Sequence, residues 1–560
     1  MFKKTDPNPQ LDIFTAPSML LGIRASKKYS DPNAWHNQFY SLVTTKIDEE
    51  IFKPLFPEGK KSGRPNASIR ILVAMSVLKE GFGCSDEDLF EKCEFDLLSR
   101  KALGMELLTD VTPSIDTYYL FRRRICEYQE RTGIDLMQLC FEQLAGKHVH
   151  LLKISGKCVR MDSKLIGSNI ARQSRYELIH ATLVKFLKTC TLTHLSPEQE
   201  ERAKEYLKED SSKTVYRSDS DTLQSNLARI GNFIMEMLAT FPATSPAHDL
   251  LQRLFDEQYA VKDGKAVLRD KKEVKADSLQ NPNDPDATYR AKNDQKVQGY
   301  VTNITETVEE GKPNIITSVQ VETAVFADCH FLQEAVENSE RVTDSTIEDL
   351  YADGAYQSPD NREFAKNHNA MQLKTGKMQG GCRWELIPHD EDGLTVREIA
   401  TGNTYEAVKA VTKQGSRKRW RIPWNNKTGW RYFEDKDIKA YQLRKQIESL
   451  PLEEQHKRNN VEAAMFQYSF HTRKGKTRYR GLLKHRMHAY SRCMWMNLRR
   501  MVIFQISTFQ RSIFALFGPI REAFGSFKAI SRKIFTSGAD CYVSLRMTTL
   551  ARLDSKYVPF

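Results

Sequence analysis

The sequence has no long apolar run. None of its hydrophobic stretches approaches the ~20 consecutive residues that a membrane-spanning helix needs. The first residues, MFKKTDPNPQLDIF, become polar at once and lack the apolar centre of a secretory signal. We therefore expect no membrane partner and a location in the cytoplasm. The composition, 40% hydrophobic and 28% charged over 560 residues, is typical of a folded protein with several domains.

Paired cysteines and histidine metal motifs are also missing. The ten cysteines are scattered singly without a CxxC pair, and the 13 histidines include no HExxH spacing. Scattered cysteines are typical of reduced thiols in a cytosolic protein. If the protein binds a metal, carboxylates are therefore its expected ligands, and carboxylates favour a hard cation such as Mg²⁺.

Acidic residues are almost absent from one long segment. Between positions 455 and 500 a single acid, Glu462, stands among twelve basic residues: Lys457, Arg458, Arg473, Lys474, Lys476, Arg478, Arg480, Lys484, Arg486, Arg492, Arg499 and Arg500. Such a segment repels itself unless a polyanion neutralises it, and the net charge of +12 makes nucleic acid the expected polyanion. A lone carboxylate here suits a cation held beside a phosphate. The alternative is a solvated helix face on which Glu462 pairs with Arg458.

The first 146 residues have a helical pattern. Residues 1–60 mix apolar patches with Pro and Asp and are interpreted as an N-terminal extension. Within 61–146, apolar spacing and capping residues predict helices over 69–78, 85–95 and 114–128. The last of these carries Arg122, Arg123 and Arg124, so the segment resembles a helix-turn-helix DNA-binding domain, and the three arginines are predicted DNA contacts. The alternative is an ordinary helical domain with a solvated arginine cluster.

Strand and helix patterns alternate from residue 147 to residue 505. Strands are predicted over 149–152, 158–161 and 346–352, a hairpin over 297–307 and 314–325, and a helix over 328–338. A helical insertion at 165–290 and a β-rich insertion at 376–440 interrupt this core, and a helical tail follows at 506–560. The predicted fold class is therefore α/β, a mixed-sheet core with an all-α N-terminal domain.

The insertion at 376–440 combines aromatic and basic residues. Trp420 and Arg421 stand among nine Trp, Arg and Lys residues between positions 417 and 431. Because aromatic rings stack on bases and arginines neutralise phosphates, both residues are predicted DNA contacts. The alternative is a small β-rich unit with tryptophans in its core.

Two acids follow predicted strands, Asp162 in VRMDS and Asp353 in LYADG. Acids at the carboxyl ends of neighbouring strands project into one crevice, where they repel each other unless a cation neutralises them. Glu462 can supply a third carboxylate. Three carboxylates that hold two Mg²⁺ or Mn²⁺ ions suit in-line displacement at a phosphodiester, so all three are predicted as catalytic residues and metal ligands. Taken alone, an Asp at a strand end is more commonly a turn residue.

Several short motifs occur in the order and spacing of a known enzyme family. They are MDS around Asp162, the Gly299-Tyr300 strand with Asn303, Asp328, YADGAY from Tyr351, RNNVE ending at Glu462, RYRG from Arg478 and NLRR from Asn497. On these pieces, which cover most of residues 60–505, the chain resembles the DDE transposases of bacterial insertion sequences. The resemblance implies an RNase H-like catalytic core in which Asp162, Asp353 and Glu462 are the metal-binding triad.

The resemblance also implies a reaction and partners. Such an enzyme recognises the ends of an element in double-stranded DNA, cleaves there and joins the 3′-ends to target DNA. It is expected to act as a homodimer across two ends and to be associated with the bacterial nucleoid when bound. The alternatives are a DNA-binding protein of the same descent that has lost catalysis, and a nuclease with the same core that cuts without joining.

The match to one signature is partial. Arg458 corresponds to the Arg of the Tyr-Arg-Glu-Lys signature in part of this superfamily, but Gln455 and Ser469 replace its Tyr and Lys. The hairpin type of cleavage associated with the full signature is therefore left open. The basic residues predicted to bind DNA phosphates in this region are Arg458, Arg473, Lys474, Lys476, Arg478 and Arg480.

Other acids compete with the predicted triad. Glu453 and Glu454 precede the basic segment and rival Glu462, but they have fewer basic neighbours. Asp284 and Asp286 lie in a Pro-interrupted Asn/Asp run, which is primarily turn chemistry. We rank all four below Asp162, Asp353 and Glu462.

Overall fold

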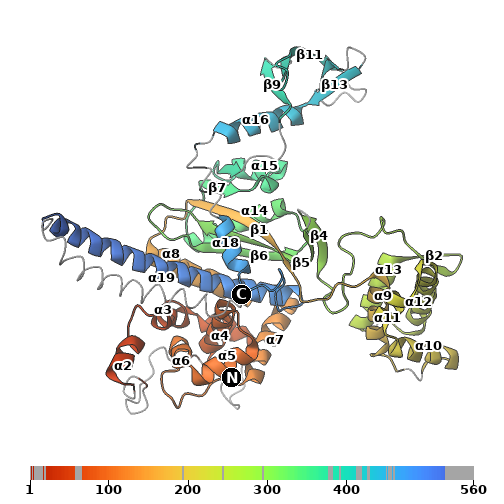
Figure 1. The fold of residues 1–560 in the computed structure, drawn as a ribbon, viewed down its shortest axis with the longest axis horizontal. Helices are drawn as coiled ribbons and strands as arrows, with labels where there is room; N and C mark the ends of the chain where they lie inside the picture. The colour runs from red at the N-terminus through yellow and green to blue at the C-terminus, as the bar shows by residue number, and fades with distance from the viewer. Residues whose placement is uncertain are drawn as a thin grey trace.

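The computed structural model describes most of the chain. The described residues are 2, 4, 17, 21–56, 66–191, 194–242, 245–292, 295–375, 382–389, 393–410, 419–424, 429–449, 451, 454, 457 and 461–523, with side chains described as far as residue 508. Figure 1 shows a central sheet between the N-terminal helices and a smaller sheet, with a helical insert to one side and the long helix α19 crossing the centre.

The elements described within the first 152 residues are all helices. In order, the elements are α2 Ile23–Tyr29, α3 Trp35–Leu42, η2 Thr44–Lys46, η3 Glu49–Leu55, α4 Ile69–Phe82, α5 Asp86–Phe95, α6 Leu97–Leu103, α7 Ile115–Thr132 and α8 Leu136–Leu152. The three predicted helices are confirmed as α4, α5 and α7. A serine caps each one, because the hydroxyls of Ser68, Ser85 and Ser114 accept hydrogen bonds from backbone N–H groups of the first turn.

The strand predicted over 149–152 is wrong. These residues form the last turn of α8, which ends where Lys153 takes a φ of 52°. Val149 is buried one turn beyond Ala145, so the apolar face of the helix continues through the run that resembled a strand. A short apolar run fits both periods, and packing of one helical face decided between them.

The central sheet has six strands. β4 Thr288–Lys292, β5 Gln295–Thr307, β1 Cys158–Gly167, β7 Asp349–Ala352 and β8 Gln372–Thr375 follow one another in space, and β6 Ile316–Thr323 also pairs with β5. β5 is antiparallel to β4, β6 and β1, whereas β7 runs parallel to β1 and β8 runs parallel to β7. The predicted hairpin is confirmed as β5 and β6, and the predicted strand at 346–352 as β7. The chain is thus a mixed α/β protein.

Helices cover the sheet and connect it to the N-terminal helices. α14 Leu332–Thr343, α8 and α19 Leu482–Ala523 contact β6, α18 Val461–Ser469 contacts β1, and α19 also packs on α4 and α8. One apolar core therefore runs from the N-terminal helices through α19 to Tyr300 and Ile304 of β5. In the described part of the chain no helix is both long and apolar enough to cross a bilayer, although α19 has 42 residues.

The helical insert has a core of its own. It consists of α9 Arg175–Leu187, α10 Pro197–Lys208, α11 Ser211–Arg217, α12 Ser220–Thr240, α13 Pro246–Gln258 and a short hairpin, β2 Tyr259–Lys262 with β3 Lys265–Leu268. Its buried residues, among them Phe186, Phe233 and Leu254, form a cluster separate from that of the sheet. The hairpin was not predicted. Its strands are short and contain lysines, so they lack a clear alternation of apolar and polar residues, and Tyr259 and Ala266 are their buried residues.

The β-rich insertion follows α15 Pro359–Asn367 and β8. Five antiparallel strands form a second sheet in the order β13 Gly429–Glu434, β12 Arg419–Trp424, β11 Thr404–Ala410, β10 Gly393–Glu398 and β9 Trp384–His389. α16 Asp435–Ser449 packs against β9 and β13. Trp384, Trp420 and Phe433 fill the core between them, so the predicted β-rich character of 376–440 is confirmed for the described strands.

A buried charge cluster fixes α19 to the sheet. Glu306 of β5 is 1% exposed at its side chain and pairs with Arg160 of β1 at 2.5 Å and with Arg500 of α19 at 2.6 Å. Replacing Glu306 with alanine leaves two guanidinium groups in an apolar setting without their counter-ion. We expect this change to lower the free energy of unfolding by roughly 3–5 kcal/mol, measured by urea denaturation.

Glu348 provides the matched control. It forms an ion pair with Lys157 in which both side chains are about 60% exposed. Its replacement by alanine is expected to cost about 0–1 kcal/mol, because water solvates and screens both charges. Equal losses for the Glu306 and Glu348 variants would contradict a structural role of the buried cluster.

Candidate active site

Asp162 and Asp353 lie on neighbouring parallel strands. Val159 pairs with Leu350 and Arg160 with Tyr351, so the register, continued two residues further, sets Asp162 beside Asp353. β7 ends at Ala352, and Asp353 caps the short helix η6 Gly354–Tyr356. The prediction that Asp162 ends its strand is wrong, because β1 continues to residue 167 in pairing with β5. The two acids nonetheless meet at the carboxyl end of β7, where α/β sheets place their sites.

The two carboxylates interact electrostatically. Asp162 Oδ1 accepts a hydrogen bond from the Ser163 N–H at 2.8 Å, and Asp353 Oδ1 accepts one from the Gly354 N–H at 2.7 Å. Burial raises the pKa of Asp162 to about 6; the Ser163 N–H opposes this rise, and the negative charge of Asp353 adds to it. A carboxylate with a raised pKa beside a second carboxylate is an arrangement that a bound cation relieves.

Tyr356 is buried within electrostatic reach of the acid pair. Its hydroxyl donates to Asn303 Oδ1 at 2.7 Å, and the Asn303 amide donates to Gln320 at 2.8 Å. Burial raises the pKa of Tyr356 well above its usual value, and the charge of Asp162 raises it further. Tyr356 therefore stays neutral and supports the edge of the sheet that carries the acids. Its place in the YADGAY motif was the available signal, but sequence reasoning gave it no role.

A third acid near this edge is already neutralised. Asp328, at the start of η5 Asp328–Phe331, is 4% exposed and pairs with Arg290 at 3.2 Å and with Lys292 at 3.6 Å. Its charge contributes to the raised pKa of Asp162, and that of Lys292 opposes it. Asp328 thus holds β4 against the hairpin end, which is a structural role.

Contacts on either side place the turn that carries Glu462 along β1. Arg160 donates to the carbonyl oxygen of Lys457 at 2.8 Å, and the Lys164 ammonium donates to Ser469 Oγ at 2.8 Å. Residues 160, 162 and 164 share one face of β1, because side chains alternate along a strand. The two contacts of that face, at 160 and 164, are with residues 457 and 469, which flank Glu462 in the chain. Glu462 is exposed in the first turn of α18, whose other face is buried.

The competing acids have structural partners. Glu454 accepts from Lys457 at 2.7 Å, from Lys374 at 3.0 Å and from the Tyr351 hydroxyl, and these bonds lower its pKa to about 2. Asp284 is fully buried and accepts from Ser168 and Tyr300. Asp286 accepts a hydrogen bond from the N–H of Leu482, the first residue of α19. Glu453 lies outside the described residues.

The carboxylates at this edge of the sheet fit a metal ion only in part. Among the described residues no group of three or more His, Cys, Asp and Glu side chains is arranged to hold a metal ion. Asp162 and Asp353 fit a hard cation, because both are carboxylates on adjacent strands and each repels the other. Glu462 does not join them in a three-carboxylate group. The two-ion triad therefore stays a prediction.

The predicted phosphate contacts gather in a turn before α19. Arg473, Lys474, Arg478 and Arg480 are exposed there, whereas Lys476 is half-buried and its ammonium donates to the carbonyl oxygen of Ile170. Backbone hydrogen bonds join this turn to the end of β1, from Gly167 to Gly475 and from Thr477 to Gly167. Arg458 lies outside the described residues, so its DNA contact stays a prediction.

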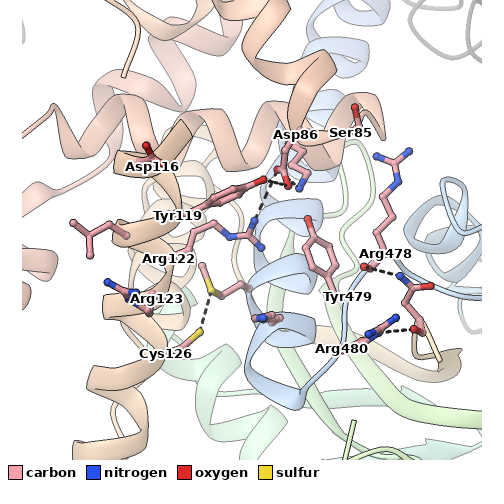
Figure 2. A pocket seen from close by; sticks show the side chains of 15 residues that line it. Ser85, Asp86, Asp116, Tyr119, Arg122, Arg123, Cys126, Arg478, Tyr479 and Arg480 are labelled. Carbon is pink, nitrogen blue, oxygen red and sulfur yellow. Dashed lines mark hydrogen bonds and ion pairs between the residues drawn. The ribbon is translucent and has the colours of Figure 1, made fainter. Parts of the chain in front are cut away.

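The structure brings two predicted DNA-binding regions to one cavity. Arg122 and Arg123 of α7 line it together with Arg478 and Arg480 from the turn before α19 (Figure 2). Arg122 lies between the rings of Tyr118 and Tyr479, at 5.4 and 5.2 Å, with a 15% exposed side chain. Arg124 lies over the Phe56 ring and is not among the lining residues. Arg123 is thus the arginine of the predicted trio that is open to a ligand there.

Trp420 and Arg421 point to opposite faces of the small sheet. Trp420 is 3% exposed within the core, so the alternative interpretation, a tryptophan core, describes this residue. Arg421 lies on the other face, 4.2 Å from the ring of Trp430, which is 49% exposed. The period of two in β12 separates these two neighbours in sequence. The exposed ring comes from Trp430 on β13, which lies diagonally across from Arg421 because Arg421 itself pairs with Tyr432.

Residues 28–124 match the family described as Transposase domain (DUF772). The matched range begins near the end of α2 and ends within α7 at Arg124, so it includes the helices that form one wall of the cavity. No curated protein and no solved structure matches the chain significantly. Residues 28–124 are thus similar to a transposase domain, and the match supports a transposase, a class of DNA-cleaving enzymes that act in transposition.

Proposed function

We propose that this protein is a DDE transposase that cleaves double-stranded DNA at the ends of an insertion sequence and joins those ends to target DNA. The observation that carries the proposal is the pair of repelling carboxylates, Asp162 and Asp353, on adjacent parallel strands of a chain whose N-terminal helices match a transposase domain. The basic turn supports it, because exposed arginines and lysines, whose charge suits phosphates, lie beside the strand that carries Asp162.

The sheet topology supports an RNase H-like core. Three antiparallel strands, β6, β5 and β1, are followed in space by β7 and β8, which run parallel to β1. In this arrangement the first and fourth core strands lie side by side, and each carries one acid. The helical insert separates β1 from the hairpin in sequence, and the small sheet separates Asp353 from Glu462, without changing the order of the core strands.

Asp162, Asp353 and Glu462 are the residues proposed to hold two Mg²⁺ or Mn²⁺ ions. When bound, such ions supply an activated attacking oxygen and stabilise the leaving oxygen. The chain itself contributes positioning: Ser163 and Gly354 fix one oxygen of each aspartate through their N–H groups, and the buried Tyr356 joins η6 to Asn303 of β5. The basic residues that flank them are proposed to orient the DNA backbone.

The proposal is tested by mapping reaction products. Purified protein is incubated with end-labelled duplexes that carry candidate element ends, with Mn²⁺ and with a supercoiled target. Cleavage at the element boundary followed by joined products is expected. Cleavage without joining would identify a nuclease, and binding without cleavage would identify a DNA-binding protein. A homodimer across two ends, which is also proposed, is measured in the same mixture by sedimentation.

A further inference from the structure

A cavity of about 1010 Å³ lies between the transposase domain and the turn that leads into α19. α5 and α7 form one wall, and residues 478–487 with Asn169 form the other. Figure 2 shows side chains from both walls turned toward one space, with Tyr479 between them. A concave site of this size is large enough to hold part of a ligand.

The cavity carries positive charge that the protein does not neutralise. Arg478 donates to the Gly83 carbonyl oxygen and Arg480 to that of Asn169, and neither forms an ion pair with a carboxylate in the described part of the chain. The same is true of Lys484, which is exposed, and Arg123 has only a loose pair with Glu127 at 3.6 Å.

The acids of the cavity do not cancel this charge. Asp86 is paired with Lys79 and lies 4.0 Å from Arg122, so Asp116 is the lining acid left to oppose the four cations. An excess of cations over acids that face one space is the electrostatic footprint of an anionic ligand.

The floor of the cavity is apolar. Leu120, Cys126 and Met487 line it, and the two sulfur atoms lie 3.8 Å apart. A free phosphate or a single carboxylate does not fill such a floor, because it offers no apolar surface. The sugar–phosphate backbone of a DNA strand offers both parts, deoxyribose for the floor and phosphates for the cations.

The position of the cavity relative to the acids follows from β1. The basic turn is bonded to Gly167 and Asn169, and Asp162 lies five residues before Gly167. At about 3.3 Å per residue, five residues of a strand span roughly 17 Å. That length corresponds to about five base pairs of duplex at 3.4 Å each.

We propose that this cavity holds the sugar–phosphate backbone of one strand of an element end, about five nucleotides from the bond that is cleaved. Arg123 from one wall and Arg478, Arg480 and Lys484 from the other neutralise its phosphates. The proposal rests on the proposed function for the identity of the DNA, but its chemistry is independent of the sequence bound. Because both walls contact the same strand, DNA links the transposase domain to the sheet that carries the acids.

The test compares DNA binding by two matched full-length variants in EDTA. R123Q/K484Q removes one exposed cation from each wall, and K271Q/K272Q removes two exposed lysines from the helical insert. Fluorescence anisotropy across a salt series should show R123Q/K484Q binding roughly tenfold more weakly at 0.15 M salt. Its slope of log affinity against log salt should be shallower by about 2, whatever the DNA sequence, because two phosphate contacts are lost. K271Q/K272Q should match the wild type.

Methylphosphonate substitution then locates the contact. Neutral linkages about five nucleotides from the cleaved bond should weaken wild-type binding more than they weaken R123Q/K484Q, which keeps Arg478 and Arg480 but has lost the other two contacts. Equal affinities and equal salt slopes for the two variants would overturn the cavity proposal. The proposal would also be overturned if ATP competed with DNA for the protein without changing the salt slope of DNA binding, because the cavity would then be a site for a free nucleotide. Absence of DNA binding by the wild type would instead refute the proposed function.

Discussion

Replacing Asp162 or Asp353 by alanine is expected to abolish strand cleavage while DNA binding is retained. Each change removes a carboxylate from the point where β1 and β7 meet. Loss of a single preorganised electrostatic group commonly lowers the rate by about 10²–10³-fold, and loss of one of two metal-binding acids should reach at least that range. The rate is measured as cleavage of a labelled element end in Mg²⁺ and in Mn²⁺.

Binding and folding distinguish this loss from unfolding. Either substitution removes the repulsion between the two carboxylates but also a backbone hydrogen bond, from Ser163 or from Gly354, so the free energy of unfolding should change by no more than about 1 kcal/mol. The alanine variant of Asp360, an exposed acid in the first turn of α15, is the control at the same edge of the sheet and should cleave normally. Cleavage at the wild-type rate by either D162A or D353A would remove the acid pair from the mechanism.

Replacing Glu462 by glutamine should reduce cleavage about as much as loss of Asp162 does. Glutamine keeps the shape of the side chain and removes the charge that a divalent cation requires of its ligand. Because Glu462 is exposed on α18, the free energy of unfolding should stay within about 0.5 kcal/mol of the wild type. Cleavage and urea denaturation are measured on the same preparation.

The control is E448Q, which removes the same charge from an exposed residue of α16, a helix that packs on the small sheet. E448Q should cleave as the wild type does. If E462Q also cleaves normally, Glu462 is not the third ligand, although the pair on β1 and β7 keeps its role. The structure makes this outcome informative, because Glu454 is already bound to Lys374 and Lys457 and is a poor substitute.

Much of the local structure could be predicted from the sequence. Serine caps and apolar spacing located α4, α5 and α7, and the turn at 309–313 located the β5–β6 hairpin. The predictions failed where local signals were ambiguous. The run at 149–152 fits both a helix and a strand, and its last helical turn was decided by burial of Val149. The end of β1 was placed too early, because pairing with β5 extends it past Asp162.

The candidate site was predictable in its components rather than in its arrangement. Acids after apolar strands indicated Asp162 and Asp353, but their adjacency depends on a parallel register between segments far apart in the chain. The support from Tyr356 through Asn303 is a contact of the same kind. Arginines at 122 and 123 look equivalent in sequence, yet packing places Arg122 between two tyrosine rings and leaves Arg123 exposed.

The sequence by itself determined which chemical groups and which local elements this protein has. These are an excess of basic residues, the acids Asp162, Asp353 and Glu462, and most of the helices and strands. These are properties of single residues and of short periodic runs. Tertiary structure decided which of them meet, that Trp420 is buried and Trp430 exposed, and that the basic turn closes a cavity against the transposase domain. The reason is physical, since strand register and close packing depend on partners distant in the chain, which no local pattern encodes.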